Sequence, residues 1–476
     1  MKATRLKSRL ASSASAVRPI WRNIQPFRRA LVPFLLAVLM YAWGTLPARA
    51  ELFPSGEIRI FDVWDIPSRM ELGMSPMEPE SADLWKDWLA KREEINPFVR
   101  DSEVKLHLRN YYLTRDNLDD EEIETWAQGG YLRLVTGRAW DKLSFGGTVY
   151  GSYRLYGPED KDGVLLLKPG QENITVLGKA YAQINYARHQ LKLGRQEYEL
   201  PWVNAQDNRM IPNTFEGYSL TTPRAENPNL QYGLGYVDKM KKRNSDTFIS
   251  MSEAAGDTSG ADHGAVMGGA RYKFADALSL EAFNVWTPDA INLFQGQVVC
   301  RLKTDMGLNL KFTGQFLHEE TVGADLLGRA AASTYALGGM AEASYRKLVG
   351  TLALTGNSAN EDLISPYGTY PGYNSVIVND YNRAGEYGLR TGLSYDLSEL
   401  GLTGVSVMGN YVWGFGAVDP ESGADIPNQD ELDLTLDYAP RASWLKGLKI
   451  RLRSAMIEEE GARDLVDNRV IINYAL

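Results

Sequence analysis

Apolar and polar side chains alternate with a period of two over most of this sequence, and this pattern constrains the fold more than any other feature. At the C-terminal end, Val470, Ile472 and Tyr474 share one side of such a pattern, and a mixed set of residues forms the other side. A period of two places the two sets on opposite faces of a β-strand. An exposed terminal strand usually frays, whereas a membrane-spanning β-barrel must seal its last strand against its first. We therefore expect an all-β, antiparallel transmembrane barrel that is closed by this strand.

The alternating pattern recurs in many segments, each close to the ~10 residues that a tilted membrane strand requires. We expect about 18 strands, since the segments lie near residues 104–117, 123–138, 142–156, 173–187, 189–199, 213–222, 229–240, 264–274, 278–287, 290–303, 306–318, 333–346, 348–357, 384–396, 403–416, 429–438, 447–457 and 467–476.

The links between these segments alternate in length. Short links such as Arg188-His189 are typical of periplasmic turns, and both ends of the barrel are then expected in the periplasm. Longer polar links fall at 115–122, 157–172, 200–212, 241–263, 319–332, 358–383, 417–428 and 458–466. A soluble β-sandwich or propeller has no reason for this long and short alternation. About 18 strands enclose a lumen wider than side chains can fill, so we expect a water-filled channel.

The N-terminal region has the features of an export signal. Residues 1–29 hold eight basic residues and no acid, an apolar run covers 30–43, and Ala48-Arg49-Ala50 offers a cleavage site. This pattern predicts a signal peptide over 1–50, because the run is shorter than the ~20 residues of a membrane anchor. Residues 51–101 then form a proline-containing N-terminal extension with a short helix over 81–94, placed in the periplasm or the lumen. Residues 102–476 are the expected barrel domain.

The charge balance excludes one class of partner. Removing residues 1–50 leaves 42 basic against 60 acidic residues, a net charge of −18, which argues against nucleic-acid binding. Acidic external loops could instead bridge to lipopolysaccharide through divalent cations. The mean hydropathy of −0.31 suits a barrel, because only alternate residues face the outer-membrane lipids. Cys300 is the single cysteine, so no intrachain disulfide can form.

Four stretches resemble a known family. They read VKLHLRNYYLTRDN at 104–117, LPWVNAQDNRMIPNTFEG at 200–217, VIVNDYNRAGEYGLRTGLSYDLSELGLTGVSVMGNYVWG at 376–414, and DELDLTLDYAPRASWLKGLKIRLRSAMIEE with DNRVIINYAL near the end. In this order they are similar to the OprD family of outer-membrane porins. Gln206 departs from the usual Asn, Leu476 replaces the common terminal aromatic, and 51–101 has no counterpart. The resemblance implies an outer-membrane location and passive uptake of small solutes, chiefly carboxylate-bearing ones such as amino acids or organic acids.

Alternation also predicts which residues face the channel. Because the apolar residues of 448–452 must face lipid, the basic residues between them face the lumen. The same argument holds for the first strand, from which only the closing strand separates them. The predicted basic track comprises Lys105, His107, Arg109, Lys449, Arg451 and Arg453. The resemblance implies such a ladder, and arginine suits it because a guanidinium binds a carboxylate through two hydrogen bonds.

An acidic row leaves a second interpretation open. Glu431, Asp433 and Asp437 also face the lumen by alternation, on the strand beside the Lys449–Arg453 segment. Cross-strand ion pairs could neutralise this wall instead of leaving a track for substrates.

Residues 200–217 are the candidate constriction loop, because they follow an upward strand and hold two prolines. Asp207 and Arg209 lie two residues apart in this loop. Folded inward, these opposite charges would create a transverse field across the channel. Alternatively, they only anchor the loop to the wall. The loop at 358–383 is a second candidate for narrowing the channel.

Signals for chemistry are absent from the sequence. Its four histidines are scattered without metal-ligand spacing, and no nucleophile elbow or phosphate loop occurs. We therefore expect neither an enzyme nor a cofactor or metal. An outer-membrane barrel enzyme, or a plugged or secretion barrel, remains the alternative, and the sequence leaves a monomer or a homo-oligomer open.

Overall fold

The computed structural model describes residues 96–117, 122–222, 228–329, 333–461 and 463–476. The predicted signal peptide and the predicted helix over 81–94 lie outside the described residues. The described part begins with the short helix α4 (Pro97–Arg100), which Asn96 caps by accepting a 2.9 Å hydrogen bond from the Phe98 N–H. Within these ranges, no helix has the length and apolar character needed to cross a membrane.

The strands form a single antiparallel sheet. They are β1 (Glu103–Asn117), β2 (Ile123–Val135), β3 (Leu143–Tyr156), β4 (Ile174–Tyr186), β5 (His189–Gln196), β6 (Thr214–Thr221), β7 (Leu230–Lys241), β8 (Ile249–Ser250), β9 (Ala265–Ala275), β10 (Leu278–Thr287), β11 (Ile291–Lys303), β12 (Leu308–Thr321), β13 (Ser333–Tyr345), β14 (Leu348–Asn357), β15 (Tyr387–Asp396), β16 (Val405–Phe415), β17 (Gln429–Tyr438), β18 (Leu448–Glu459) and β19 (Arg463–Ala475). β8 pairs only with β7, and β7 also pairs with β9. The closed wall therefore has 18 strands, as predicted.

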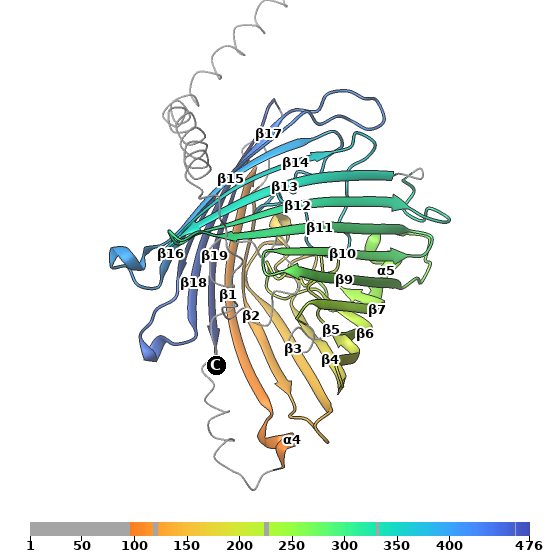
Figure 1. Cartoon of the computed structure of the whole chain (residues 1–476), viewed down its shortest axis with the longest axis vertical. Coiled ribbons are helices and arrows are strands. Elements are labelled where there is room, and N and C mark those ends of the chain that lie inside the picture. Colours follow the sequence, from red (N-terminus) through yellow and green to blue (C-terminus); the bar gives the residue numbers. More distant parts are fainter. Residues whose placement is uncertain (1–95, 118–121, 223–227, 330–332, 462) are drawn as a thin grey trace, which may run out of the picture. The chain divides into compact units, whose positions relative to one another are not determined.

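The last strand closes the barrel against the first. β1 pairs with β2 on one side and with β19 on the other (Figure 1). In this register, Arg109 lies opposite Gly129 and Asn473. At the end of this seam, Leu106 and Leu476 exchange two backbone hydrogen bonds of 3.1 and 2.8 Å. The expectation drawn from the terminal alternation is confirmed.

The two faces of the wall differ as the alternation predicts. On β17 the side chains of Leu434 and Leu436 are 49% and 38% exposed on the outer face, whereas Glu431 and Asp437 are 0% and 1% exposed on the inner face. Apolar residues outside and charged residues inside are the arrangement that lipid and a polar lumen require.

Two strands extend further than the sequence indicated. β12 continues to Thr321 and β19 begins at Arg463, whereas loops were predicted from 319 and up to 466. Backbone pairing continues through these positions, with Glu320 opposite Ser333 and Ile457 opposite Leu465. Polar side chains suggested loops there, but a strand can carry them beyond the membrane because its ladder hydrogen bonds do not depend on side-chain polarity.

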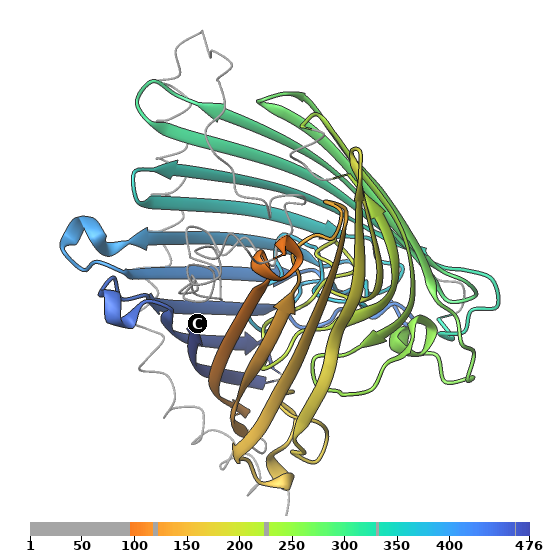
Figure 2. The same ribbon diagram turned by 90° about the horizontal axis from the view of Figure 1, so that it is seen from below.

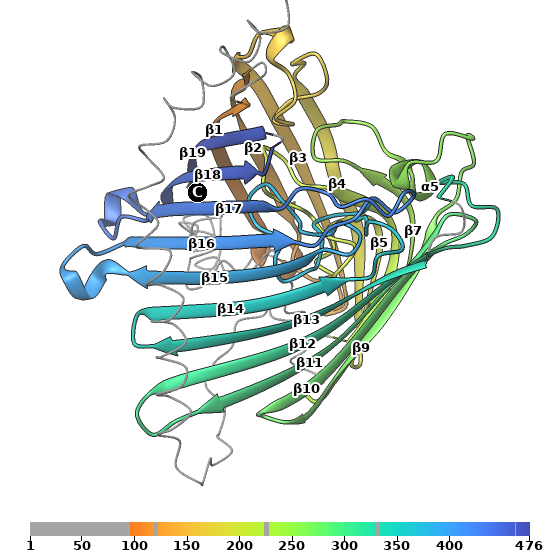
Figure 3. The ribbon, with the colours of Figure 1, turned by 90° about the horizontal axis from the view of Figure 1, so that it is seen from above.

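Several long loops fold against the inner wall. They are residues 157–173, 197–213, 242–264 with β8 and helix α5 (Met251–Ala255), and 358–386. Figures 2 and 3 show the strands encircling a lumen that loop segments cross. One apolar cluster packs Trp202, Tyr367 and Tyr370 from the loops against inner-wall residues that include Phe283 and Leu293. These contacts fix the loops inside the barrel.

Candidate pore constriction

The loop at 197–213 is held to the barrel seam by Arg109. This arginine points inward from β1, is 2% exposed, and donates hydrogen bonds of 2.7 and 3.1 Å to the two carboxylate oxygens of Asp207. It also donates a 2.6 Å hydrogen bond to the Arg209 carbonyl and a 2.9 Å hydrogen bond to the Asn473 side chain. A bidentate guanidinium–carboxylate pair is strong and directional. The structure thus brings Arg109 of the predicted basic track into direct contact with Asp207 of the predicted constriction loop.

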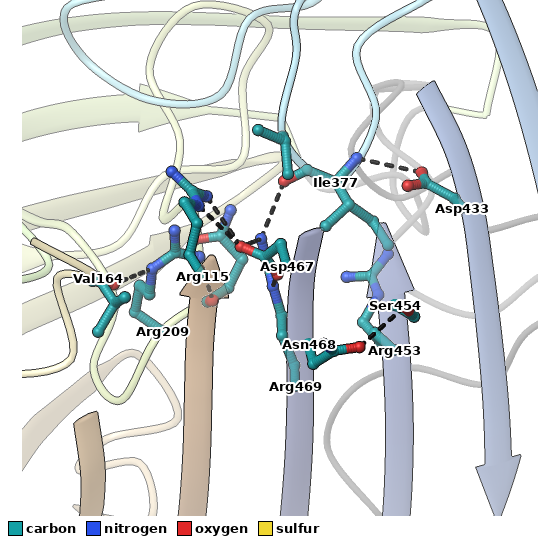
Figure 4. A network of polar contacts seen from close by, with 12 residues as sticks. Arg115, Val164, Arg209, Ile377, Asp433, Arg453, Ser454, Asp467, Asn468 and Arg469 are labelled. Atoms are coloured by element: carbon teal, nitrogen blue, oxygen red, sulfur yellow. Dashed lines mark hydrogen bonds and ion pairs between the residues drawn. The ribbon is translucent and has the colours of Figure 1, made fainter. Parts of the chain in front are cut away.

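Arg209 has a different environment. Its guanidinium donates to the carbonyls of Val164 and Asn208, at 2.7 and 2.9 Å, instead of to a carboxylate (Figure 4). Burial lowers the pKa of Arg209 well below its usual range, and the nearby Arg469 and Arg243 lower it further. Burial likewise lowers the pKa of Arg243, to about 10. Asp207 and Arg209 therefore both carry anchoring contacts, and positive charge gathers where the loops meet the seam.

Two members of the predicted basic track form ion pairs on the wall. Arg451 donates two hydrogen bonds of 2.7 Å to Asp437, and the Lys449 ammonium lies 3.0 Å from the same carboxylate. All three residues are at most 1% exposed. Arg453, two residues further along β18, donates a 3.3 Å hydrogen bond to Thr435. Asp437, one of the three acids in the predicted row, is thus ion-paired with both Arg451 and Lys449.

The other two acids of that row contact a loop. Glu431 accepts hydrogen bonds from the backbone N–H groups of Val378 and Asn379, and Asp433 accepts one from Ile377. These residues belong to the loop at 358–386, the second predicted constriction candidate. The acidic row therefore has two roles: Asp437 pairs with bases, and its neighbours bind backbone.

The remaining track residues, Lys105 and His107, lie in the N-terminal half of β1. The Lys105 ammonium sits 5.8 Å from the centre of the Tyr131 ring, and the His107 ring lies 4.9 Å from the same tyrosine. Lys105 and Tyr131 both face the lumen, on neighbouring strands. The Lys105 ammonium and the Tyr131 ring thus form a cation–π contact.

The inner faces of β2, β4 and β5 carry further cations that the sequence prediction did not include. Arg133 on β2 lies opposite Lys105, Lys179 comes from β4, and Lys192 comes from β5. The Lys192 ammonium is 4.6 Å from the centre of the Tyr181 ring, and the Lys179 ammonium is 5.8 Å from the Tyr150 ring. Lys192 could have been found from the alternation of β5 alone. Lys179 follows a register shift opposite the Thr148–Val149 step, which interrupts the period.

A connected network links the seam to the loops. Asp467 on β19 accepts hydrogen bonds from Arg115, at 2.9 and 3.1 Å, and from Arg469, at 2.5 and 3.2 Å (Figure 4). Arg469 in turn donates a 3.1 Å hydrogen bond to the carbonyl of Ile377. The sequence prediction missed these residues, although alternation places them on the inner face.

A closed 18-strand antiparallel barrel with an apolar outer face, a charged lumen and loops folded inward defines an outer-membrane porin. The family model for outer membrane porins of the OprD family matches residues 96–476, and the chain belongs to this family. The protein therefore resides in the bacterial outer membrane.

Relatives cover nearly the whole barrel. Porin D of Pseudomonas aeruginosa is 24% identical over 429 residues, which span 82% of this chain and 94% of that protein. The porin-like protein GalP of Pseudomonas putida is 24% identical over 408 residues, spanning 80% and 93%. The crystal structure of P. aeruginosa OccK9 (OpdG) matches with a TM-score of 0.72 at 25% identity, covering 80% of this chain and 100% of that one. P. aeruginosa OpdK with vanillate matches at 0.71 and 22% identity, covering 80% and 99%.

Proposed function

We propose that this porin is a passive, non-enzymatic channel that admits small solutes carrying a carboxylate group. The solute gradient supplies the driving force. The observation that carries the proposal is a pair of inward-facing cations, Arg133 and Lys192, for which the described part of the chain offers no ion-pair partner. Cations that are not neutralised by the wall attract anions into the lumen and leave them weakly bound, which permits passage.

The surroundings of these cations favour organic acids that contain a ring. Lysine ammonium groups lie over Tyr131 and Tyr181, so cations and aromatic rings lie side by side on this wall. A carboxylate can meet the cation while a ring packs on a tyrosine. The structure of OpdK with vanillate, an aromatic acid, supports this assignment by likeness of fold.

Single-channel recordings in planar bilayers test the proposal. We expect benzoate to reduce the ionic current, whereas benzamide, which has the same size but no charge, should not. The double substitution Arg133→Gln with Lys192→Met removes both cations while retaining similar side-chain volume. It should weaken the benzoate effect several-fold.

Lys347→Met is the matched control, because Lys347 lies in the β13–β14 turn and already pairs with Asp396 at the end of β15. This variant should respond to benzoate as the wild type does. Equal effects of benzoate and benzamide on the wild type would overturn the carboxylate proposal while leaving the porin assignment intact.

A further inference from the structure

The part of the 358–386 loop that contacts β17 lies within residues 375–380, here called the tip segment. Three successive backbone N–H groups of this segment point at two carboxylates of β17. Val378 and Asn379 donate to the two oxygens of Glu431, both at 2.8 Å, and Ile377 donates to Asp433 at 3.2 Å. A carboxylate that receives backbone N–H groups forms charge-assisted hydrogen bonds, which are stronger than neutral ones.

A cation holds the same segment from the other side. Arg469 on β19 donates a 3.1 Å hydrogen bond to the Ile377 carbonyl, so the residue's N–H and C=O are bound by side chains of opposite charge (Figure 4). Asp467 holds Arg469 in place with bonds of 2.5 and 3.2 Å. β17 and β19 flank β18, and the tip segment lies across this part of the wall.

The rest of the loop is fixed independently. Its first half buries Leu363, Tyr367 and Tyr370 in the large apolar cluster, and Gln315 donates a 2.9 Å hydrogen bond to the Pro371 carbonyl. In the tip segment, by contrast, only Ile377 and Val378 make apolar contacts, with the small cluster of Ala455, Ile457 and Leu465. The tip can therefore detach while the first half of the loop stays packed.

Glu431 depends on these N–H groups as much as the tip depends on Glu431. Its side chain is 0% exposed, and the described part of the chain provides it with no lysine or arginine within ion-pair distance. A buried carboxyl group without hydrogen bonds is costly, so the two N–H groups of the tip segment, together with the neighbouring Asp433 carboxyl, satisfy the oxygens of Glu431. A position on the wall that only needed polarity would be served equally by glutamine.

We propose that Glu431 and Asp433 are positioning residues that clamp the tip segment to β17 and thereby set the bore of the pore. While the clamp is intact, the tip covers Arg469 and Asp467 and narrows the lumen. When it is broken, the tip detaches into the channel, the first half of the loop stays in place, and the open-channel current fluctuates. The inference concerns the width of the pore and holds for a porin of any selectivity.

Thiol labelling combined with single-channel recording tests the clamp. In a Cys300→Ser background, a reporter cysteine is introduced by Ile377→Cys in the tip, or by Thr369→Cys in the packed half of the loop. Glu431→Gln keeps the size of the side chain but replaces one accepting oxygen by a donor that faces another donor. We expect the labelling rate at position 377 to rise by about tenfold or more, with no change at position 369. The current should become larger and noisier.

Two further variants complete the design. Glu431→Asp retains the carboxyl group and should restore slow labelling in large part. Asp433→Asn should give a smaller increase than Glu431→Gln, because Asp433 accepts a single N–H group, which an amide oxygen can still accept, whereas Glu431 uses both of its oxygens. Only protein that migrates as a folded barrel is measured. Unchanged labelling at position 377 in both neutral variants would overturn the proposal. An equal rise at positions 377 and 369 would overturn it too, because the whole loop would then have unfolded.

Discussion

Replacing Asp437 by asparagine separates the two interpretations of the charged wall. The carboxylate is 1% exposed and sits between Arg451, at 2.7 Å, and Lys449, at 3.0 Å. At an effective dielectric constant of about 20, each unit-charge pair at ~4 Å is worth about 4 kcal/mol. Water in the lumen reduces this value, and breaking a buried pair typically costs ~3–5 kcal/mol. We therefore expect Asp437→Asn to lower the free energy of unfolding by about 3 kcal/mol.

The same substitution should change ion selectivity. Two positive charges lose their common counter-charge, so the lumen becomes more attractive to anions. The reversal potential across a salt gradient measures this shift, and the urea midpoint measures stability. Asp430→Asn is the matched control, because Asp430 is on the same strand and accepts a hydrogen bond from Tyr411 on the outer face. If Asp437→Asn matched the control in both measurements, the ion pairs would contribute nothing and the reasoning would be refuted.

Three other predictions address the loops. Asp207→Asn removes the charge that Arg109 binds, and at ~1.5–3 kcal/mol per charge-assisted bond the amides of 206–210 should exchange hydrogen at least about tenfold faster; unchanged exchange would contradict the anchoring role. Trp202→Ala should cost ~3–5 kcal/mol in a urea titration, since this 0% exposed side chain packs against Tyr370, and a loss below ~1 kcal/mol would show that the cluster repacks. Burial raises the pKa of Asp380, so folding favours its protonated form and that stabilisation is lost as pH rises through the raised pKa. Asp380→Asn should therefore have a higher urea midpoint than the wild type at neutral pH and a similar one in acid; the opposite order would refute the assignment.

The sequence could predict which segments form strands and which of their side chains face the lumen, because both depend only on local alternation. Lipid must meet Leu434 and Leu436, so Glu431 and Asp437 had to face inward, and the structure places them there. The end of β12 was predicted too early because Glu319 is polar. The strand in fact continues to Thr321, since the ladder of backbone hydrogen bonds tolerates polar side chains beyond the membrane.

Partner choice inside the lumen could not be predicted from the alternation. Glu431 and Asp437 are equivalent in the sequence pattern, yet one binds loop backbone and the other binds two bases. The difference arises from the loop at 358–386, whose path depends on apolar contacts of Tyr367 and Tyr370 with distant strands. The pairing of Arg109 with Asp207 likewise joins segments far apart in the chain, and no local signal encodes it.

A further apolar cluster, which lies beside the seam between the first and last strands, has a consequence for biogenesis. It brings together Tyr111 of the first strand, Ile471 of the last strand, and Val164, Met210 and Ile211 from two loops. Since its members come from both sides of the seam, this cluster cannot assemble until the final strand has docked. The loop contacts at positions 164, 210 and 211 are therefore complete only in a closed barrel, so closure of the barrel and the final placement of these loops are coupled.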